Sequence, residues 1–132
     1  MAVTVVWEEG MHFCTRVPSG RLMCDESSDI GAVYPSAPEL LMASLGSCIG
    51  SVLVTFAERH EIPLEGMQIV LDWQIAERPH RIGEITVAVS VPEGVSGPQR
   101  ETLERVAHAC LIHNTLTHPP EISLQLTTGA RS

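Results

Sequence analysis

Four cysteines are the residues of this sequence best suited to chemistry of their own: Cys14, Cys24, Cys48 and Cys110. Thiols react with peroxides, form disulfides and bind metals, but no C-x-x-C spacing occurs, so zinc-ribbon and thioredoxin-type signals are absent. In a reducing compartment, widely spaced thiols are either redox-active or simply buried. The surroundings of each cysteine must decide between these interpretations.

Cys48 lies deep inside a long apolar segment that is expected to be helical. Its neighbours are small, and they permit close helix crossing or leave space beside the thiol: Ser44, Gly46, Ser47, Gly50 and Ser51. On this local pattern alone, an inert core cysteine is the simpler interpretation, because free cysteine packs as a small hydrophobe. Burial without a positive neighbour also raises a thiol's pKa.

Cys110 lies on the apolar stripe of a second predicted helix, together with Leu103, Val106, Ala107 and Leu111. By itself this position also favours a core residue. The following residues, 111–114 (LIHN), weaken the helix and could expose the thiol near its end. Two cysteines on the inward faces of two helices can meet within the disulfide range of about 4.4–6.8 Å between Cα atoms.

The long helix has clear boundaries in the sequence. Ser36 and Glu39 form a capping box, the pattern continues to about His60, and Pro63 ends it. Apolar residues go almost all the way round this helix, which must therefore be buried on every side. One small domain offers too little cover, so the sequence predicts an intertwined dimer with this helix at its centre.

The other elements are predicted to be mostly strands. Residues 2–9, 11–17 and 21–25 form a β-meander, a polar loop follows over 26–36, and alternating patterns predict strands over 67–76, 84–91 and 121–127. A hairpin connection is expected over residues 79–83, and a capping box of Ser96 and Gln99 opens the second helix. Hairpin-linked strands with helices grouped apart indicate a single α+β domain, residues 1–132.

Composition excludes some classes of function. The formal net charge of -8 over 132 residues argues against nucleic acid and against anionic membrane surfaces as partners. The N-terminal MAVTVVWEEG lacks the pattern of a signal peptide, and no apolar run is expected to be long enough to span a bilayer. These features favour the cytoplasm.

Two segments carry a resemblance to a known family. Residues 37–48 (APELLMASLGSC) resemble the helix motif of the OsmC-like family, and residues 107–116 (AHACLIHNTL) resemble its second cysteine motif. Gly20, and Asp25 before a loop, also fit, so the resemblance covers nearly the whole chain. It implies a swapped α+β homodimer with two sites at the subunit interface.

The resemblance implies a thiol-dependent peroxidase that reduces organic hydroperoxides in oxidative-stress defence. Cys48 would be the peroxidatic thiol and Cys110 the resolving thiol, and an external dithiol would reduce their disulfide. No metal and no organic cofactor is needed. An apolar helix beside the site favours a fatty or aromatic hydroperoxide.

The sequence also departs from the best-understood branches, OsmC proper and the organic hydroperoxide resistance proteins, which activate the thiol with an Arg–Glu pair. Glu39 is the candidate carboxylate, but it lies one residue closer to Cys48 than in those branches, a turn of about 100° on a helix. The capping box with Ser36 also explains a glutamate at position 39 without a catalytic role. Arg16 and Arg21 are the candidate arginines, although neither lies in a matching motif. The details look closest to a less characterised branch.

Other interpretations therefore stay open. The alternative function is that of a non-enzymatic dimer that senses redox state or binds an apolar small molecule. This alternative is favoured if no arginine reaches Cys48. A metal site of His12, Cys14 and Cys24 is a weak alternative to ordinary strand residues. The histidines near Cys110 (His108, His113 and His118) are explained most simply as polar residues at a helix end, although His113 could tune that thiol.

Overall fold

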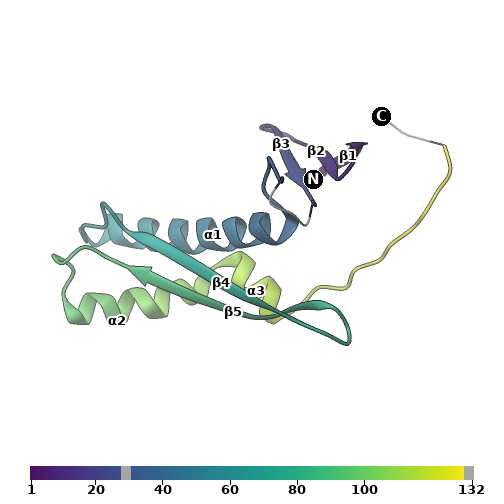
Figure 1. Cartoon of the computed structure of the whole chain (residues 1–132). Coiled ribbons are helices and arrows are strands. Elements are labelled where there is room, and N and C mark those ends of the chain that lie inside the picture. Colours follow the sequence, from purple (N-terminus) through teal and green to yellow (C-terminus); the bar gives the residue numbers. More distant parts are fainter. Residues whose placement is uncertain (28–30, 130–132) are drawn as a thin grey trace.

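The structure is a computed structural model that describes residues 1–27 and 31–129. Its elements in chain order are β1 (Thr4–Glu9), β2 (His12–Val17), β3 (Gly20–Asp25), α1 (Ala37–Arg59), β4 (Gln68–Ala76), β5 (Arg81–Ser90), α2 (Gly97–Val106), a 3-10 turn η1 (Ala107–Ala109) and α3 (Leu111–Thr117). The strands form two antiparallel sheets, β1-β2-β3 and β4-β5, beside the helices (Figure 1). The predicted α+β class and the order of elements as far as the second helix are confirmed.

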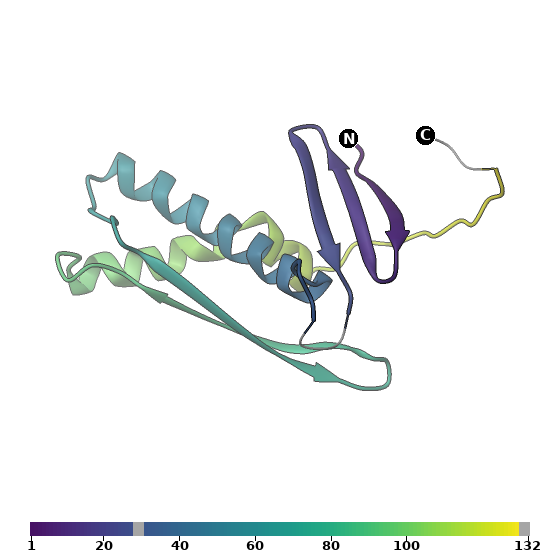
Figure 2. The same cartoon turned by 45° about the horizontal axis from the view of Figure 1, so that its top comes forward.

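The N-terminal sheet is the meander that the sequence predicts. It stands apart from the helices and is joined to α1 by the loop that follows β3 (Figure 2). Cys14 pairs with Met23, whereas Cys24 pairs with Phe13. Directly paired residues point to the same face and neighbouring residues to opposite faces. Cys14 and Cys24 therefore lie on opposite faces of the sheet.

The predicted boundaries of the long helix are confirmed. Ser36 is the N-cap of α1: its Oγ accepts the N–H of Glu39 at 3.3 Å, and Glu39 Oε1 accepts the N–H of Ser36 at 2.9 Å. One face of α1 is buried, through Met42, Leu45, Gly46, Ile49, Leu53 and Ala57. The other face is open in a single chain, where Val54 is 39% exposed. Burial on every side is therefore not achieved within one chain.

The β4-β5 hairpin covers the buried face of α1. Ile69 pairs with Val89 and Leu71 with Val87, so these side chains share the apolar face that the alternation predicts. A Cβ at Gly46 would lie 2.9 Å from Leu71 Cδ1, so glycine allows the strand to approach the helix closely. The turn occupies residues 77–80 instead of 79–83, because β5 already begins at Arg81 and passes through an irregularity opposite Gln74 and Ile75.

The second helical segment differs from the prediction of one continuous helix. The Ser96 capping box forms as expected, but α2 ends at Val106, η1 follows, and Cys110 adopts an extended conformation with ψ of 128°. Cys110 is thus the N-cap of a separate helix, α3. The break turns Leu111 away from the predicted apolar stripe and leaves it 72% exposed.

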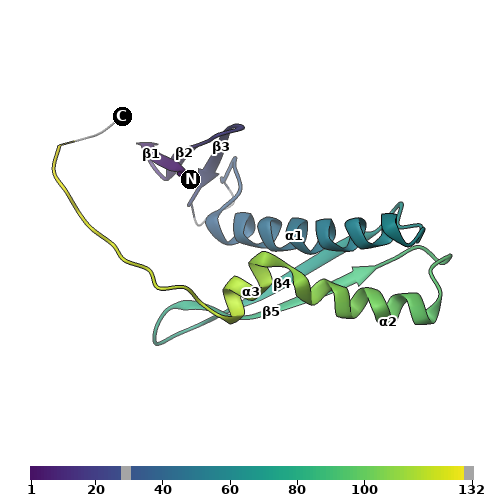
Figure 3. The ribbon, with the colours of Figure 1, turned by 180° about the vertical axis from the view of Figure 1, so that it is seen from behind.

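The predicted final strand over residues 121–127 is not formed in the single chain. This segment is extended but unpaired and leaves the body of the molecule as a long tail (Figure 3). Its alternating apolar residues are almost fully exposed: Ile122, Leu124 and Leu126 at 86%, 88% and 93%. Alternation favours a strand only where a neighbour supplies hydrogen bonds and an apolar surface, and no strand in the described part of this chain does so.

By length and composition alone, α1 could cross a membrane, since it has 23 residues and its most apolar stretch has a mean hydropathy of 1.9. The expectation that no apolar run is long enough is therefore wrong by that measure. Within this fold, however, α1 has the position of a core helix. Strand β4, helices α2 and α3 and the turn η1 all pack against it.

Candidate active site

The two cysteines of the long helix and of the second cysteine motif meet at the start of α3. Cys48 projects from α1, and its side chain makes a hydrogen bond with the side chain of Cys110. Cys110 is fully buried, whereas Cys48 is only half-buried. Both are free thiols. The structure thus brings together, in one chain, a reachable thiol and a buried one.

The surroundings of Cys48 stabilise a thiolate without a charged side chain. The hydrogen bond from Cys110 has the largest effect and lowers the pKa of Cys48. The backbone N–H of Ile112 lowers this pKa further, burial opposes the shift, and the N–H of Leu111 adds a smaller lowering. Hydrogen bonds donated to the charged form favour that form, so these donors act in the same direction as a nearby cation would.

Cys110 has the opposite environment. Burial raises the pKa of the Cys110 thiol, and its hydrogen bond to Cys48 raises it further. The Cys110 sulfur also accepts the backbone N–H of His113 at 3.4 Å and so caps α3. Cys110 is therefore held as a protonated thiol, in contact with the sulfur that is more easily ionised.

The carboxylate and the arginines expected from the sequence lie elsewhere in the single chain. Glu39 is exposed in its capping box, where the hydrogen bond from the N–H of Ser36 lowers the pKa of Glu39. Arg16 and Arg21 pair with each other across β2 and β3 and are exposed. Among the described residues, the hydrogen bonds that act on the pKa of Cys48 come only from Cys110, Leu111 and Ile112.

Cys14 and Cys24 are buried side chains of the meander. Burial raises the pKa of Cys24, and its hydrogen bond to Glu26 Oε1 at 3.6 Å raises it further. Since these two cysteines face opposite sides of the sheet, they cannot share one metal ion with His12. Within residues 1–27 and 31–129, no group of three or more His, Cys, Asp or Glu side chains has a metal-binding arrangement.

Sequence reasoning did not identify the backbone donors at Leu111 and Ile112. Amide groups carry no sequence signal of their own, and only the weak helical pattern of residues 111–114 marks the break that frees them. Two of the histidines near Cys110 contact each other: the rings of His108 and His113 pack edge to face, with centroids 5.3 Å apart.

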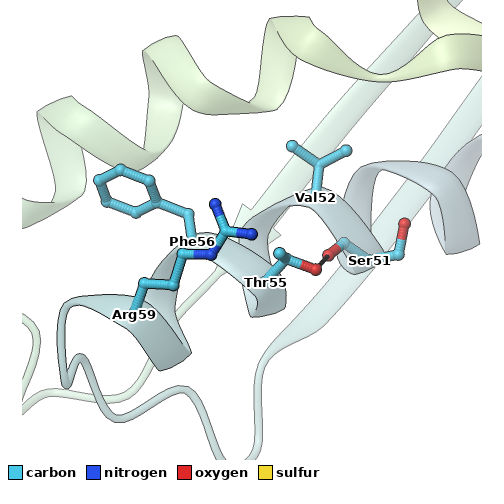
Figure 4. Close-up of a pocket in the computed structure, with 5 residues that line it drawn as sticks. All are labelled: Ser51, Val52, Thr55, Phe56 and Arg59. Atoms are coloured by element: carbon cyan, nitrogen blue, oxygen red, sulfur yellow. Dashed lines mark hydrogen bonds between the residues drawn. The ribbon is translucent and has the colours of Figure 1, made fainter.

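Several hollows lie along α1 in the described part of the chain. A larger one, of about 500 Å³, is bounded by α1, β5 and the segment from α2 to α3, and most of its lining is apolar: Ile49, Leu53, Val87, Val89, Val91, Leu103 and Ala107. The rest of the lining is polar and consists of Arg100, Glu104, His108 and His113. A shallower hollow of about 290 Å³ lies on the outer face of α1, where the Arg59 side chain lies beside Phe56 and Thr55 (Figure 4). Neither Cys48 nor Cys110 lines the larger cavity, but it is lined by His113, whose backbone N–H donates to the Cys110 sulfur.

Comparison with known proteins agrees with this fold. The sequence matches the family described as OsmC-like protein over residues 28–125. Similar folds occur in the OsmC-like protein of Mycoplasma pneumoniae (18% identity, TM-score 0.78, 89% of this chain and 87% of that chain). They also occur in the organic hydroperoxide resistance protein OhrB of Bacillus subtilis (17% identity, TM-score 0.69, 90% of this chain and 93% of that chain).

A third solved structure, an organic hydroperoxide resistance protein OsmC from Legionella pneumophila, has 18% identity and a TM-score of 0.67, with 87% of each chain covered. No curated protein matches the sequence. At these identities the solved structures show a shared fold, while the family match extends over most of the chain. The chain belongs to the OsmC-like protein family.

Proposed function

We propose that this protein is a thiol-dependent peroxidase that reduces organic hydroperoxides, with Cys48 as the peroxidatic and Cys110 as the resolving cysteine. The contact between the two thiols, with pKa values shifted in opposite directions, is the observation that carries the proposal. A peroxidatic thiol must be ionised and reachable, and a resolving thiol must lie beside it. The names of the similar hydroperoxide resistance proteins support the same reaction.

The proposed cycle has three steps. The Cys48 thiolate attacks the terminal peroxide oxygen, the O–O bond breaks, Cys48 becomes a sulfenic acid, and the leaving alkoxide takes a proton to form an alcohol. The Cys110 thiol then attacks the sulfenic sulfur, which forms the disulfide and releases water. An external dithiol reduces the disulfide by exchange and is itself oxidised. The cytoplasm, where thiols are kept reduced, suits this cycle.

The apolar cavity is the basis for proposing a bulky organic hydroperoxide as the substrate. Valines of β5 and core residues of α1 line most of it, so a hydrocarbon or aromatic group of a hydroperoxide would replace water there. A small, strongly hydrated peroxide gains nothing from such a lining. Bulky hydroperoxides should therefore be better substrates than hydrogen peroxide.

The working form is proposed to be a homodimer. One chain leaves apolar surface uncovered on α1 and along the tail, and both edges of the β4-β5 sheet are unpaired within the described residues. A second copy can supply the missing strand and cover. In such a dimer, Arg16 or Arg21 of a second copy, oriented by Glu39, would be the candidate for an additional group that activates the Cys48 thiol.

Peroxide consumption by the purified protein tests the function. With cumene hydroperoxide and excess dithiol, the Cys48→Ser variant should lose at least about 99% of the activity, since it has no thiolate to attack. Cys24→Ser, which removes a buried thiol of the meander, is the matched control and should keep most of the activity. Unchanged turnover in Cys48→Ser would rule out the proposed reaction.

A non-enzymatic redox sensor or carrier of an apolar molecule is the second candidate. It is favoured by the single-chain geometry, in which the carboxylate Glu39 and the candidate arginines lie away from Cys48. A sensor would react once with hydroperoxide and turn over slowly with dithiol. Native mass spectrometry of the protein as purified would reveal a carried ligand.

A further inference from the structure

The first turn of α3 is held by the two sulfur atoms of the site. The backbone N–H of His113 donates to the sulfur of Cys110 at 3.4 Å, and the N–H groups of Leu111 and Ile112 lie near enough to Cys48 to lower the pKa of its thiol. The first four N–H groups of any helix have no partner inside that helix. In α3, the Cys110 sulfur satisfies that of His113, and those of Leu111 and Ile112 act on the Cys48 thiol.

The remaining support for α3 is modest. The helix spans only Leu111–Thr117, and none of its residues is fully buried. Helices shorter than about 12–15 residues are marginal in water without tertiary support. Ile112 packs on the core cluster, while Leu111 is 72% exposed. The stability of α3 as a helix therefore depends strongly on the hydrogen bonds at its N-terminus.

We propose that the Cys48–Cys110 pair is also a redox switch, in which disulfide formation removes the N-cap of α3 and loosens this helix and the tail that follows it. The Cys110 sulfur cannot keep its place at the N–H of His113 and also bond covalently to Cys48. A disulfide needs an S–S distance of about 2.05 Å and a dihedral angle near 90°, which moves the sulfur out of its capping position.

The switch consumes one hydroperoxide for each disulfide that it forms. Hydroperoxide converts the Cys48 thiol to a sulfenic acid and is reduced to an alcohol, and the Cys110 thiol then displaces water as the S–S bond forms. Cys48 loses its negative charge in this reaction, so the amides of Leu111 and Ile112 lose a charged acceptor as well. An external dithiol restores both thiols and the cap.

The consequence reaches beyond the site because α3 leads directly into the exposed apolar tail. Leu116 lies at the end of α3, and Ile122, Leu124 and Leu126 follow in the tail. A loosened α3 anchors this tail less firmly. The oxidation state of the two cysteines would thereby change a surface that is available to a second protein chain.

Hydrogen–deuterium exchange of the full-length protein tests the switch. We expect the amides of residues 111–117 to exchange about tenfold faster in the disulfide form than in the dithiol form, the range expected for a lost N-cap. Helix α2 is capped by Ser96 and not by sulfur, so its exchange should be unchanged and serves as the internal control. Equal or slower exchange of α3 in the disulfide form would overturn the switch.

Two variants at one position separate capping from disulfide formation. Cys110→Ser keeps a good N-cap but forms no disulfide, so α3 should stay protected with and without oxidant. Cys110→Ala removes the cap, so α3 should exchange fast even without oxidant. The switch is contradicted if α3 in Cys110→Ala is as protected as in the reduced wild type.

The inference rests on the proposed function only for its oxidant, an organic hydroperoxide. Mass spectrometry of the same samples shows whether hydroperoxide forms the Cys48–Cys110 disulfide, and a negative result counts against the peroxidase. The disulfide can then be formed with diamide and the exchange of α3 measured, so the two proposals fail separately.

Discussion

Cys48 and Cys110 share a hydrogen bond that moves their pKa values in opposite directions. The bond lowers the pKa of the half-buried Cys48 and raises that of the buried Cys110. Ionisation is therefore directed to the sulfur that a substrate can reach. Burial, the contact between the two thiols and the backbone donors at the start of α3 produce this difference within one chain, without an arginine.

The first prediction concerns the pH dependence of Cys48. A thiol with a lowered pKa becomes thiolate at lower pH than a free cysteine, whose pKa is about 8.5. Cys110→Ala removes the largest cause of the lowering, so the midpoint of Cys48 alkylation should move to higher pH. Iodoacetamide labelling of Cys48, followed by mass spectrometry from pH 5 to 10, measures it.

Cys110→Ser is the matched control for that measurement. Its hydroxyl can donate to Cys48 in place of the thiol, so the midpoint should stay close to that of the wild type. Equal midpoints in the alanine variant and the wild type would show that Cys110 does not activate Cys48.

A second prediction concerns Asp25, which is fully buried. Its carboxylate accepts the N–H groups of Ser27 and Val33, and its Oδ2 lies 3.2 Å from His12 Nε2. Its hydrogen bonds with Ser27 and Val33 lower the pKa of Asp25 to about 2. A folded-state pKa below the unfolded one stabilises the protein above the ordinary carboxyl range, and this is lost as pH falls toward 2.

Asp25→Asn should therefore lower the Tm markedly at pH 7, and the deficit should shrink as the pH falls from about 4 toward 2. Asp72→Asn, at an exposed position on β4, is the control and should change the Tm little. Thermal unfolding followed by circular dichroism measures both. A deficit of constant size across this pH range would mean that the Asp25 charge is not what stabilises the loop.

A third prediction concerns the hairpin that covers α1. A Cβ on Gly83 would lie 2.5 Å from the Cβ of Ala76, which is fixed to the backbone and cannot turn away. Gly83→Ala should cost about 1–3 kcal/mol of unfolding free energy. Gly94→Ala, whose Cβ would find only Pro63 at 3.9 Å, should be nearly neutral. Urea denaturation compares the two, and equal midpoints would contradict the close contact.

A fourth prediction concerns assembly. Leu124 is 88% exposed in one chain, so Leu124→Lys should leave a single chain unharmed but place a charge where a dimer would bury leucine. We expect the dissociation constant of the proposed dimer to rise at least about tenfold. Gln125→Lys adds the same charge to the opposite side of the tail and should have little effect. Sedimentation velocity over a range of concentrations distinguishes them.

The sequence predicts well those elements whose signals are local. The capping box of Ser36 and Glu39 identifies the start of α1, and the alternation of residues 67–76 identifies a half-buried strand. Each signal depends on neighbours in the chain, and the family resemblance points to both cysteines. These parts of the fold needed no tertiary contact to be predicted.

The parts that could not be predicted depend on distant contacts. Cys110 has the spacing of a helical stripe, yet the chain breaks there because its sulfur caps α3 beside Cys48. The tail has the alternation of a strand, but Leu124 finds no partner strand in the described part of one chain. Arg16 and Arg21 have positions that no local pattern relates to Cys48.

Thiol counting with disulfide mapping tests whether Cys48 and Cys110 react as a pair with hydroperoxide. The reduced protein has four free thiols per chain. After one equivalent of cumene hydroperoxide per chain, we expect that two thiols are lost and that mass spectrometry finds a Cys48–Cys110 disulfide, with Cys14 and Cys24 still reduced. Four remaining thiols, or oxidation of Cys14 or Cys24 in place of this pair, would contradict it.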